Sequence, residues 1–128
     1  MSLSPNAELA NSMLGDACAT LRAGERPVVH SDCGCHYRWP GWVAICDEFG
    51  LERSMSAKGC SPDNSACEGF FGRLKNEMFY HRDWAGVSFE EFEAAVGAYI
   101  EQYNETRIKK SLGWMSPNQY RRSKGFAA

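Results

Sequence analysis

The stretch from Ser61 to Tyr80 constrains the fold most, because its pattern is that of one amphipathic helix. Ser61 can accept a backbone N–H as the N-cap, and Pro62 suits the first helical position, where no N–H is needed. Apolar side chains recur at steps of three and four residues and predict one buried face, formed by Cys67, Phe70, Phe71, Leu74 and Met78. A second face carries an amide, a carboxylate and an ammonium, on Asn64, Glu68 and Lys75. Taken alone, this second face has the composition of an ordinary solvated surface.

The chain before this helix has the pattern of two helices and two short strands. Apolar residues at helical spacing (Leu9, Met13, Ala17 and Leu21) define the first helix. The predicted order is a helix capped by Ser4 that stops at Gly24, a buried strand at 27–31, a helix from Trp42 that stops at Gly50, and a strand at 51–56. Strands that alternate with helices are typical of an α/β fold.

The chain after the central helix has the pattern of two more helices joined by a basic loop. Ser88 and Glu91 form a capping box, and a long aromatic stripe that follows it is more typical of a core than of a base-stacking surface. We expect a loop at 104–115, and then a last helix that Ser116 caps and Gly125 ends. The total is about five helices and two strands.

Charge is distributed unevenly along the chain. The formal net charge is −2, but residues 104–128 contain six basic side chains and one acidic side chain. The basic residues of this segment are Arg107, Lys109, Lys110, Arg121, Arg122 and Lys124. A basic segment on an acidic body can bind phosphate although the total charge is negative. A solvated terminal segment explains the charge equally well.

Cysteine usage and hydropathy limit the cellular compartments in which the protein can be expected. The six cysteines form no C-x-x-C pair, no apolar run approaches the roughly 18 residues of a membrane span, and no segment resembles a signal peptide. We therefore expect reduced thiols in a cytoplasmic protein without a membrane segment. A zinc module at Cys33, Cys35 and His36 is a weaker alternative, because one intervening residue is too few for the usual zinc knuckle.

Two acidic residues, Asp32 and Glu68, form the candidate catalytic pair. Asp32 follows the strand at 27–31 directly, which is where α/β proteins place functional residues, although Asp before Gly34 also suits a simple Asx turn. If the 35 intervening residues bring Glu68 beside it, the two carboxylates are hard ligands for Mg²⁺ or Mn²⁺. Paired metals of this kind stabilise the entering and leaving oxygens of phosphodiester displacement. Asn64 and Lys75 share the face of Glu68 and could position a substrate phosphate or base beside the metals.

Five motifs in order resemble the integrase-core transposases of bacterial insertion sequences, which are relatives of retroviral integrases. They are H-S-D-C-G-C-H-Y from His30, S-M-S-A-K-G from Ser54, D-N-S-A-C-E-G-F-F-G-R-L-K-N-E from Asp63, Y-I-E-Q-Y-N-E-T-R from Tyr99 and S-L-G-W-M-S-P-N-Q-Y from Ser111. The resemblance extends over nearly the whole chain from Asn6. It implies a DNA transposase or integrase, which is a polynucleotidyl transferase. It also implies a location in the bacterial cytoplasm, in association with the nucleoid.

The resemblance also implies a fold and roles for single residues. The family has a ribonuclease H-like core whose Asp, Asp and Glu bind two divalent metals, so Asp32 corresponds to the second aspartate and Glu68 to the glutamate. Asn64 and Lys75 match helix positions that approach DNA in relatives. The basic stretch at Arg107, Lys109 and Lys110 resembles the terminal DNA-binding segment of the family, although the family often has a histidine at the position of Lys109.

The first aspartate of the family has no equivalent before Ser4. We expect residues 1–5 to be a cloning scar or disordered, and residues 6–128 to be the C-terminal part of the catalytic core, without the N-terminal half of the sheet. On this interpretation the fragment is inactive alone, and its uncovered sheet edge favours a homodimer. The alternative is a non-catalytic regulator or remnant that binds DNA or dimerises.

Overall fold

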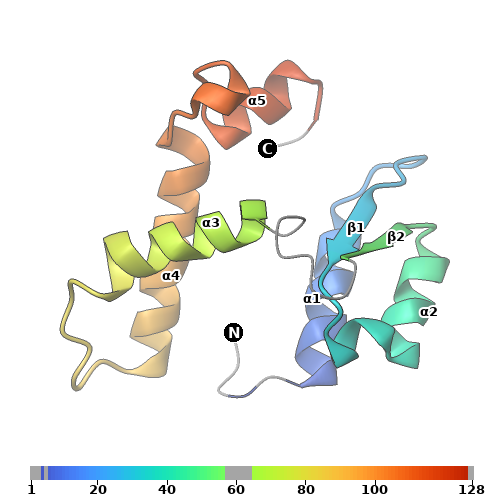
Figure 1. Cartoon of the computed structure of the whole chain (residues 1–128), viewed down its shortest axis with the longest axis horizontal. Helices are drawn as coiled ribbons and strands as arrows, with labels where there is room; N and C mark the ends of the chain where they lie inside the picture. Colours follow the sequence, from blue (N-terminus) through green and yellow to red (C-terminus); the bar gives the residue numbers. More distant parts are fainter. Residues whose placement is uncertain (1–3, 5, 57–64, 127–128) are drawn as a thin grey trace. The chain divides into compact units, whose positions relative to one another are not determined.

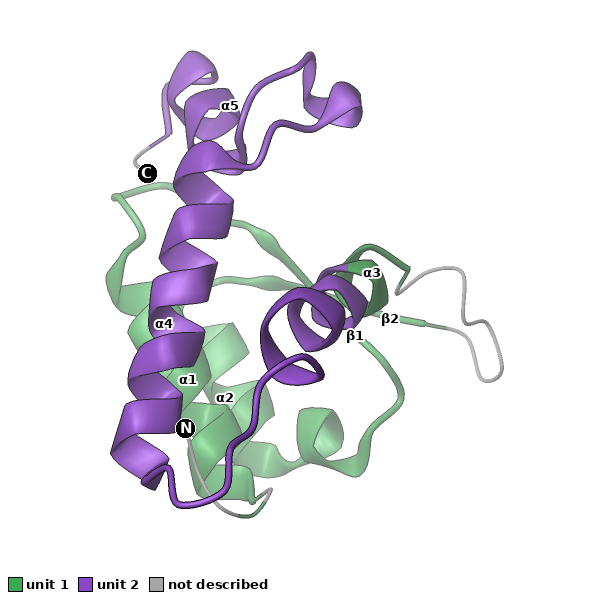
Figure 2. Cartoon of the chain, turned by 90° about the vertical axis from the view of Figure 1, so that its left-hand side faces the viewer, with its two compact units in different colours: residues 1–69 green, residues 70–128 purple. Residues whose placement is uncertain are grey.

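The structure is a computed structural model that describes residue 4 and the ranges 6–56 and 65–126. The described residues form five α-helices and two β-strands, as the sequence predicts (Figure 1). The chain divides into two compact units, residues 1–69 and 70–128 (Figure 2). Within the described ranges, no helix combines the length and the apolar character that crossing a membrane requires.

The N-terminal unit has the strand–helix–strand order of an α/β protein. Strand β1 (Val28–Ser31) pairs in parallel with β2 (Glu52–Met55), and Val28 lies opposite Glu52 in the register. Two parallel strands need a crossover connection. Helix α2 (Pro40–Glu48), preceded by the 3-10 helix η1 (Cys35–Arg38), provides it. The predicted strands are therefore confirmed, with the α/β class.

Helix α1 (Ala7–Ala19) starts later than the sequence predicts. Its N-cap is Asn6, whose side-chain oxygen accepts the backbone N–H of Leu9 at 2.7 Å, and not Ser4. Asparagine is as strong an N-cap as serine, and Asn6 directly precedes the first helical residue. The helix ends at Ala19 with Thr20 as its C-cap, and the predicted stop, Gly24, lies in the following turn with a φ of 87°.

The core of the N-terminal unit lies between α1 and α2. Its buried residues are Leu14, Cys18, Trp42, Cys46 and Leu51. The face predicted for α1 is only partly correct, because Cys18 is buried and Leu21 packs against the core, but Met13 is 54 % exposed and Leu14 is buried in its place. The contact with α2 selects this face. Burial raises the pKa of the Cys18 and Cys46 thiols, which keeps both in the unreactive protonated form.

Strand β1 is less buried than the sequence predicts. Val29 packs against the core, whereas Val28 is 57 % exposed. Successive side chains of a strand point to opposite faces, and α1 and α2 contribute the core on one of them. The apolar run of β1 therefore does not mean that both faces of this strand are buried.

The predicted central helix is confirmed over its described part, with one difference. Helix α3 (Ser65–Leu74) continues into a π-helical turn, η3 (Lys75–Phe79), whose last hydrogen bond runs from the Tyr80 N–H to the Lys75 carbonyl at 2.8 Å. The predicted cap and first turn, residues 61–64, lie outside the described residues. The predicted buried face is only partly correct. Met78 is buried, Phe70 and Leu74 are half-buried, and Cys67 and Phe71 are exposed.

Aromatic side chains join the end of this helix to α4 (Phe89–Thr106) within the C-terminal unit. The Trp84 ring stacks on Phe79 and meets the edge of Phe92, with ring centroids 6.1 and 4.9 Å apart. The indole N–H of Trp84 donates to the Phe79 carbonyl at 2.9 Å. Edge-to-face packing and a paired indole N–H are the features of an aromatic core. The aromatic stripe of α4 has the core role here that the sequence predicts.

Both predicted capping boxes are present in the C-terminal unit. Ser88 caps α4 with Glu91, and Ser116 caps α5 (Pro117–Ser123) with Gln119. Hydrogen bonding to the Ser88 backbone N–H, and then to the Ser88 side chain, lowers the pKa of the Glu91 carboxyl. The predicted start of the basic loop at Asn104 is wrong, because α4 continues to Thr106. The loop itself starts at Arg107.

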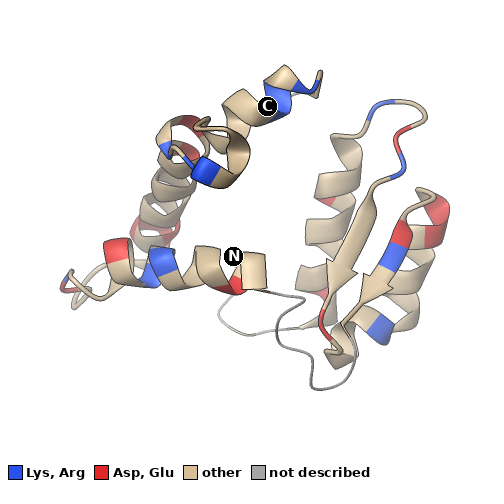
Figure 3. Ribbon diagram, turned by 45° about the horizontal axis from the view of Figure 1, so that its top comes forward, with Lys and Arg blue, Asp and Glu red and all other residues tan. Residues whose placement is uncertain are grey.

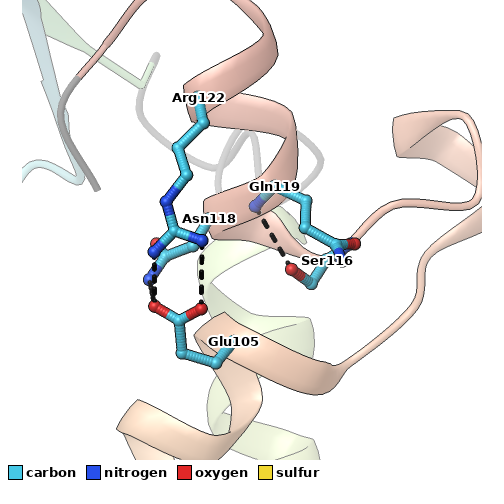
Figure 4. Close-up of polar contacts among 5 residues, drawn as sticks. All are labelled: Glu105, Ser116, Asn118, Gln119 and Arg122. Atoms are coloured by element: carbon cyan, nitrogen blue, oxygen red, sulfur yellow. Dashed lines mark hydrogen bonds and ion pairs between the residues drawn. The ribbon is translucent and has the colours of Figure 1, made fainter.

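Glu105 near the end of α4 joins this helix to α5 (Figure 4). One carboxylate oxygen accepts from the Asn118 amide at 2.6 Å, and both accept from the Arg122 guanidinium, at 2.9 and 3.3 Å. Hydrogen bonds from Asn118 and then Arg122 lower the pKa of Glu105. A bidentate carboxylate–guanidinium pair fixes orientation as well as distance, so Glu105 sets the angle between the two helices.

We expect Glu105→Gln to destabilise the packing of α5 at neutral pH. The pKa of Glu105 is lowered in the folded state, so its contribution is complete above the ordinary glutamate pKa and is lost as the pH falls through the lowered value. The thermal midpoint of the variant should lie below that of wild type at neutral pH and converge with it in acid. Glu101→Gln, on an exposed residue of the same helix, is the control. A Glu105 variant whose midpoint matches wild type at neutral pH would contradict the prediction.

Candidate functional site

A basic pocket in the C-terminal unit brings together three of the predicted DNA-binding residues. It has a volume of about 310 Å³, and its lining includes Arg107, Lys109 and Lys110 of the loop after α4. Arg73 of α3 joins them from a distant part of the sequence. Four cations around one pocket create a positive potential that suits a phosphate. Figure 3 marks the basic residues of this unit in blue.

Tyr103 forms the aromatic wall of this basic pocket. The ring is 7 % exposed, and it meets the edge of the Phe70 ring at a centroid distance of 5.0 Å. The Arg107 guanidinium lies 5.6 Å from its centroid and the Lys109 ammonium 5.9 Å. Cation–π attraction at this range holds long basic side chains over the ring. Tyr103 is therefore a core residue that also orients two cations.

Arg107 has an acidic partner inside the same unit. Its guanidinium forms an ion pair with Glu77 of the π-helical turn, and the Tyr99 hydroxyl donates to the same carboxylate at 3.1 Å. Burial, followed by this bond to Glu77, raises the pKa of Tyr99, so the hydroxyl stays protonated and donates. Arg107 is thus held in place by Glu77. Among the described residues, Lys109 and Lys110 form no ion pair with an acidic side chain, so they are the better candidates for binding an external phosphate.

The other two predicted DNA contacts are Lys75 and Asn64. Lys75 is exposed and is the first residue of the π-helical turn. Asn64 lies outside the described residues. The prediction that Asn64 and Lys75 share a DNA-facing surface therefore remains a prediction.

Asp32 ends β1 with an Asx turn, which is the alternative that the sequence left open. Its Oδ1 accepts the Gly34 N–H at 2.7 Å. A Cβ at Gly34 would lie 2.8 Å from that oxygen, so the turn needs glycine there. The turn does not exclude a functional role, because it fixes an exposed carboxylate at the C-terminal end of a parallel strand and involves only one of its oxygens.

The segment after Asp32 is tied to the end of β2. The Cys33 thiol donates to the Ser56 carbonyl at 2.9 Å. The two ring nitrogens of His30 share hydrogen bonds with the hydroxyls of Ser54 and Ser56, at 3.0 and 3.1 Å. These contacts hold the Asp32 turn against a rigid sheet edge, which is a requirement for a precise ligand position.

Glu68 is exposed in the first turn of α3. Its predicted convergence with Asp32 remains a prediction. Among the described residues, no group of three or more His, Cys, Asp or Glu side chains could hold a metal ion. That result also gives no support to the zinc alternative at Cys33, Cys35 and His36, which all lie among the described residues.

Sequence reasoning missed Arg73, Glu77 and Trp114. Arg73 and Glu77 stand four residues apart on the central helix, and that spacing marks a shared face, but nothing local relates them to a loop 30 residues later. Trp114 follows Gly113 in the basic loop and is 68 % exposed. An aromatic residue beside a glycine and two lysines is the signal that could have identified it.

Part of this chain is similar to a family of known proteins. Residues 68–124 match the integrase core domain family. A "Probable transposase for insertion sequence element IS1353" of Shigella flexneri is 57 % identical over 123 residues, covering 96 % of this chain and 24 % of the relative. The chain matches an integrase-core transposase of an insertion element.

Other proteins that are similar to this chain, at lower identity, carry similar names. An "Uncharacterized transposase-like protein" of Haemophilus influenzae is 42 % identical, over 92 % of this chain and 53 % of that protein. The "Transposase InsF for insertion sequence IS3A" of Escherichia coli is 36 % identical, over 93 % of this chain and 42 % of that protein. The chain thus spans between a quarter and about half of the length of these relatives. The matched integrase core segment begins at Glu68 and contains every residue that lines the basic pocket.

Proposed function

We propose that these residues are the C-terminal part of the catalytic core of a DNA transposase with a ribonuclease H-like fold. The observation that carries the proposal is the 57 % identity to a transposase over 96 % of the chain. The parallel strand–helix–strand unit supports the fold, and the integrase core match supports the enzyme class, a polynucleotidyl transferase. DNA is then the partner, and the bacterial cytoplasm, with the nucleoid, is the location.

Asp32 and Glu68 are the proposed metal ligands and catalytic residues. Two exposed carboxylates are a donor set that fits Mg²⁺ or Mn²⁺. When bound, paired metals would activate the attacking hydroxyl and stabilise the leaving oxygen. The Asx turn at Gly34 orients one oxygen of Asp32, and the helix presents Glu68 on a rigid element. Two of the three acidic residues of the family are thus present, so we propose that these residues alone do not catalyse strand transfer.

The basic pocket is the proposed DNA contact. Lys109 and Lys110 would bind a backbone phosphate. Arg107, which its ion pair with Glu77 holds in place, would add positive potential. Lys75 and Asn64 would contact DNA from the segment of the central helix. Phosphate contacts of this kind set position rather than sequence preference. A homodimer is the proposed assembly, because an exposed strand such as β1 can pair with or pack against a second copy.

Mn²⁺ binding followed by NMR tests the proposed metal site. Mn²⁺ is paramagnetic and should selectively broaden amide signals near Asp32 and Glu68 in the 128-residue chain. We expect Asp32→Asn to weaken Mn²⁺ binding by roughly tenfold or more, a loss typical of metal-site substitutions. The amide oxygen of asparagine can still accept the Gly34 N–H, so the turn should survive.

Asp47→Asn, at an exposed carboxylate of α2, is the matched control and should leave broadening around Asp32 and Glu68 unchanged. Broadening spread evenly over the acidic residues, or Asp32 signals unaffected by Mn²⁺, would contradict the metal site. Mg²⁺-dependent strand transfer by the 128-residue chain would contradict the proposal that it is inactive alone.

A further inference from the structure

Trp114 is the residue of the basic loop that packing within the unit does not explain. Among the described residues it is the one non-glycine residue with a positive φ, 62°, and its side chain is 68 % exposed. A bulky residue in the left-handed region is strained. A buried ring would offset that strain through contacts, but this ring faces solvent. Strain without burial points to a function outside the fold.

The loop holds Trp114 in one place relative to the lysines. Gly113 also has a left-handed backbone, with a φ of 64°. The Trp114 N–H donates to the Lys109 carbonyl at 3.1 Å, and the Lys109 N–H donates to the Met115 carbonyl at 3.1 Å. These bonds close residues 109–115 into a tight turn. The backbones of Trp114 and Lys109, which carry the exposed indole and the first lysine side chain of the pocket, are therefore hydrogen-bonded to each other.

An exposed aromatic ring beside a basic pocket is the combination that binds single-stranded nucleic acid. The pocket lined by Arg73, Lys109 and Lys110 suits a phosphate, as argued above. The indole offers a flat face to a base, and every base can stack on it. A protein partner would meet the same ring only across a strongly positive surface. The charge of the loop thus favours nucleic acid.

We propose that Trp114 stacks on an unpaired nucleobase of DNA whose adjoining phosphate is held by Lys109 and Lys110. The inference rests on the proposed function, that the chain acts on DNA. Bases inside a duplex are covered by their neighbours on both faces, so the site requires a single strand, a gap or a frayed end. Trp114 is in this view a DNA-binding residue that recognises an unpaired base by shape.

Trp114→Gly separates this role from a structural one. Glycine adopts a positive φ without strain, so the variant removes the ring and relieves the backbone together. We expect its thermal midpoint to equal or exceed that of wild type. Its affinity for a fluorescein-labelled single-stranded oligonucleotide, measured by anisotropy, should fall roughly tenfold, the effect of losing one stacked base. Its affinity for a blunt duplex should change much less, and Trp114→Phe should keep most of the single-strand affinity.

Phe126→Ala is the matched control, because Phe126 is 53 % exposed in the same unit but lies outside the loop. It should leave both affinities unchanged. Unchanged single-strand affinity in Trp114→Gly, with wild type binding DNA, overturns this inference alone. Wild type that binds neither oligonucleotide contradicts the proposed function as well. A lower midpoint or lost self-association, with unchanged DNA affinity, would make Trp114 a protein contact and overturn the inference.

Discussion

Trp42→Ala is expected to unfold the N-terminal unit. The indole is 3 % exposed, packs in the core between α1 and α2, and meets the Tyr37 ring edge-to-face at 4.9 Å. Replacing a buried tryptophan by alanine costs about 3–5 kcal/mol. A single core in a unit of this size rarely supplies more than about 3–5 kcal/mol. The substitution therefore removes most or all of the stability of this unit.

Hydrogen exchange measured by NMR resolves the two units. In Trp42→Ala we expect the amides of α1 and α2 to lose protection, while those of α4 keep it. Trp39→Ala is the matched control, since Trp39 stands three residues earlier and is 38 % exposed. It should cost less than about 1 kcal/mol. Protection in α1 that survives Trp42→Ala would show that the core depends on other residues.

The elements that the sequence predicted well are those that local chemistry determines. The capping boxes at Ser88 and Ser116 need only residues three positions apart, and the structure contains both. The two strands and the short helix between them were also predicted from the local pattern, and the structure pairs the strands in parallel. The Asx turn at Asp32 likewise needs only Gly34 nearby. The exception is the cap of α1, where Ser4 was predicted and Asn6 accepts the Leu9 N–H.

Burial could not be predicted in the same way. Periodicity shows which face of an element is apolar, but another element must cover that face before it is buried. Val28 and Phe71 are both on predicted buried faces, and they are 57 % and 50 % exposed. On α1 the packing of α2 selected Leu14 and Cys18 rather than the neighbouring positions.

The basic pocket depends on contacts that no local pattern indicates. Glu77 pairs with Arg107 across 30 residues, and a π-helical turn at Glu77 accompanies this pair. The lysines of the pocket were predicted from their charge and from a family resemblance. The place of Arg73 in the pocket and the strained backbone of Trp114 follow only from the folded conformation of the loop.

Replacing Lys109 and Lys110 together by glutamine is expected to reduce affinity for duplex DNA by about 100-fold at ~0.1 M salt, if each lysine neutralises one phosphate. The dependence of log K on log salt should become less steep by about two, because each lost phosphate contact releases about one counterion fewer. Fluorescence anisotropy over a series of salt concentrations measures both quantities. The hydrogen bonds of the turn at Lys109 join backbone atoms, so a polar, uncharged glutamine should leave them in place.

The matched control is Arg26→Gln with Arg53→Gln, which removes the same charge from two exposed residues of the N-terminal unit. If the pocket binds phosphate, the control should keep the slope of wild type. If only the overall charge matters, both double variants should lose affinity equally, and the slope should fall by the same small amount in each. Equal losses would therefore remove the basic pocket from the DNA interface. A change of about two in the slope, confined to the lysine pair, would identify these two ammonium groups as phosphate ligands.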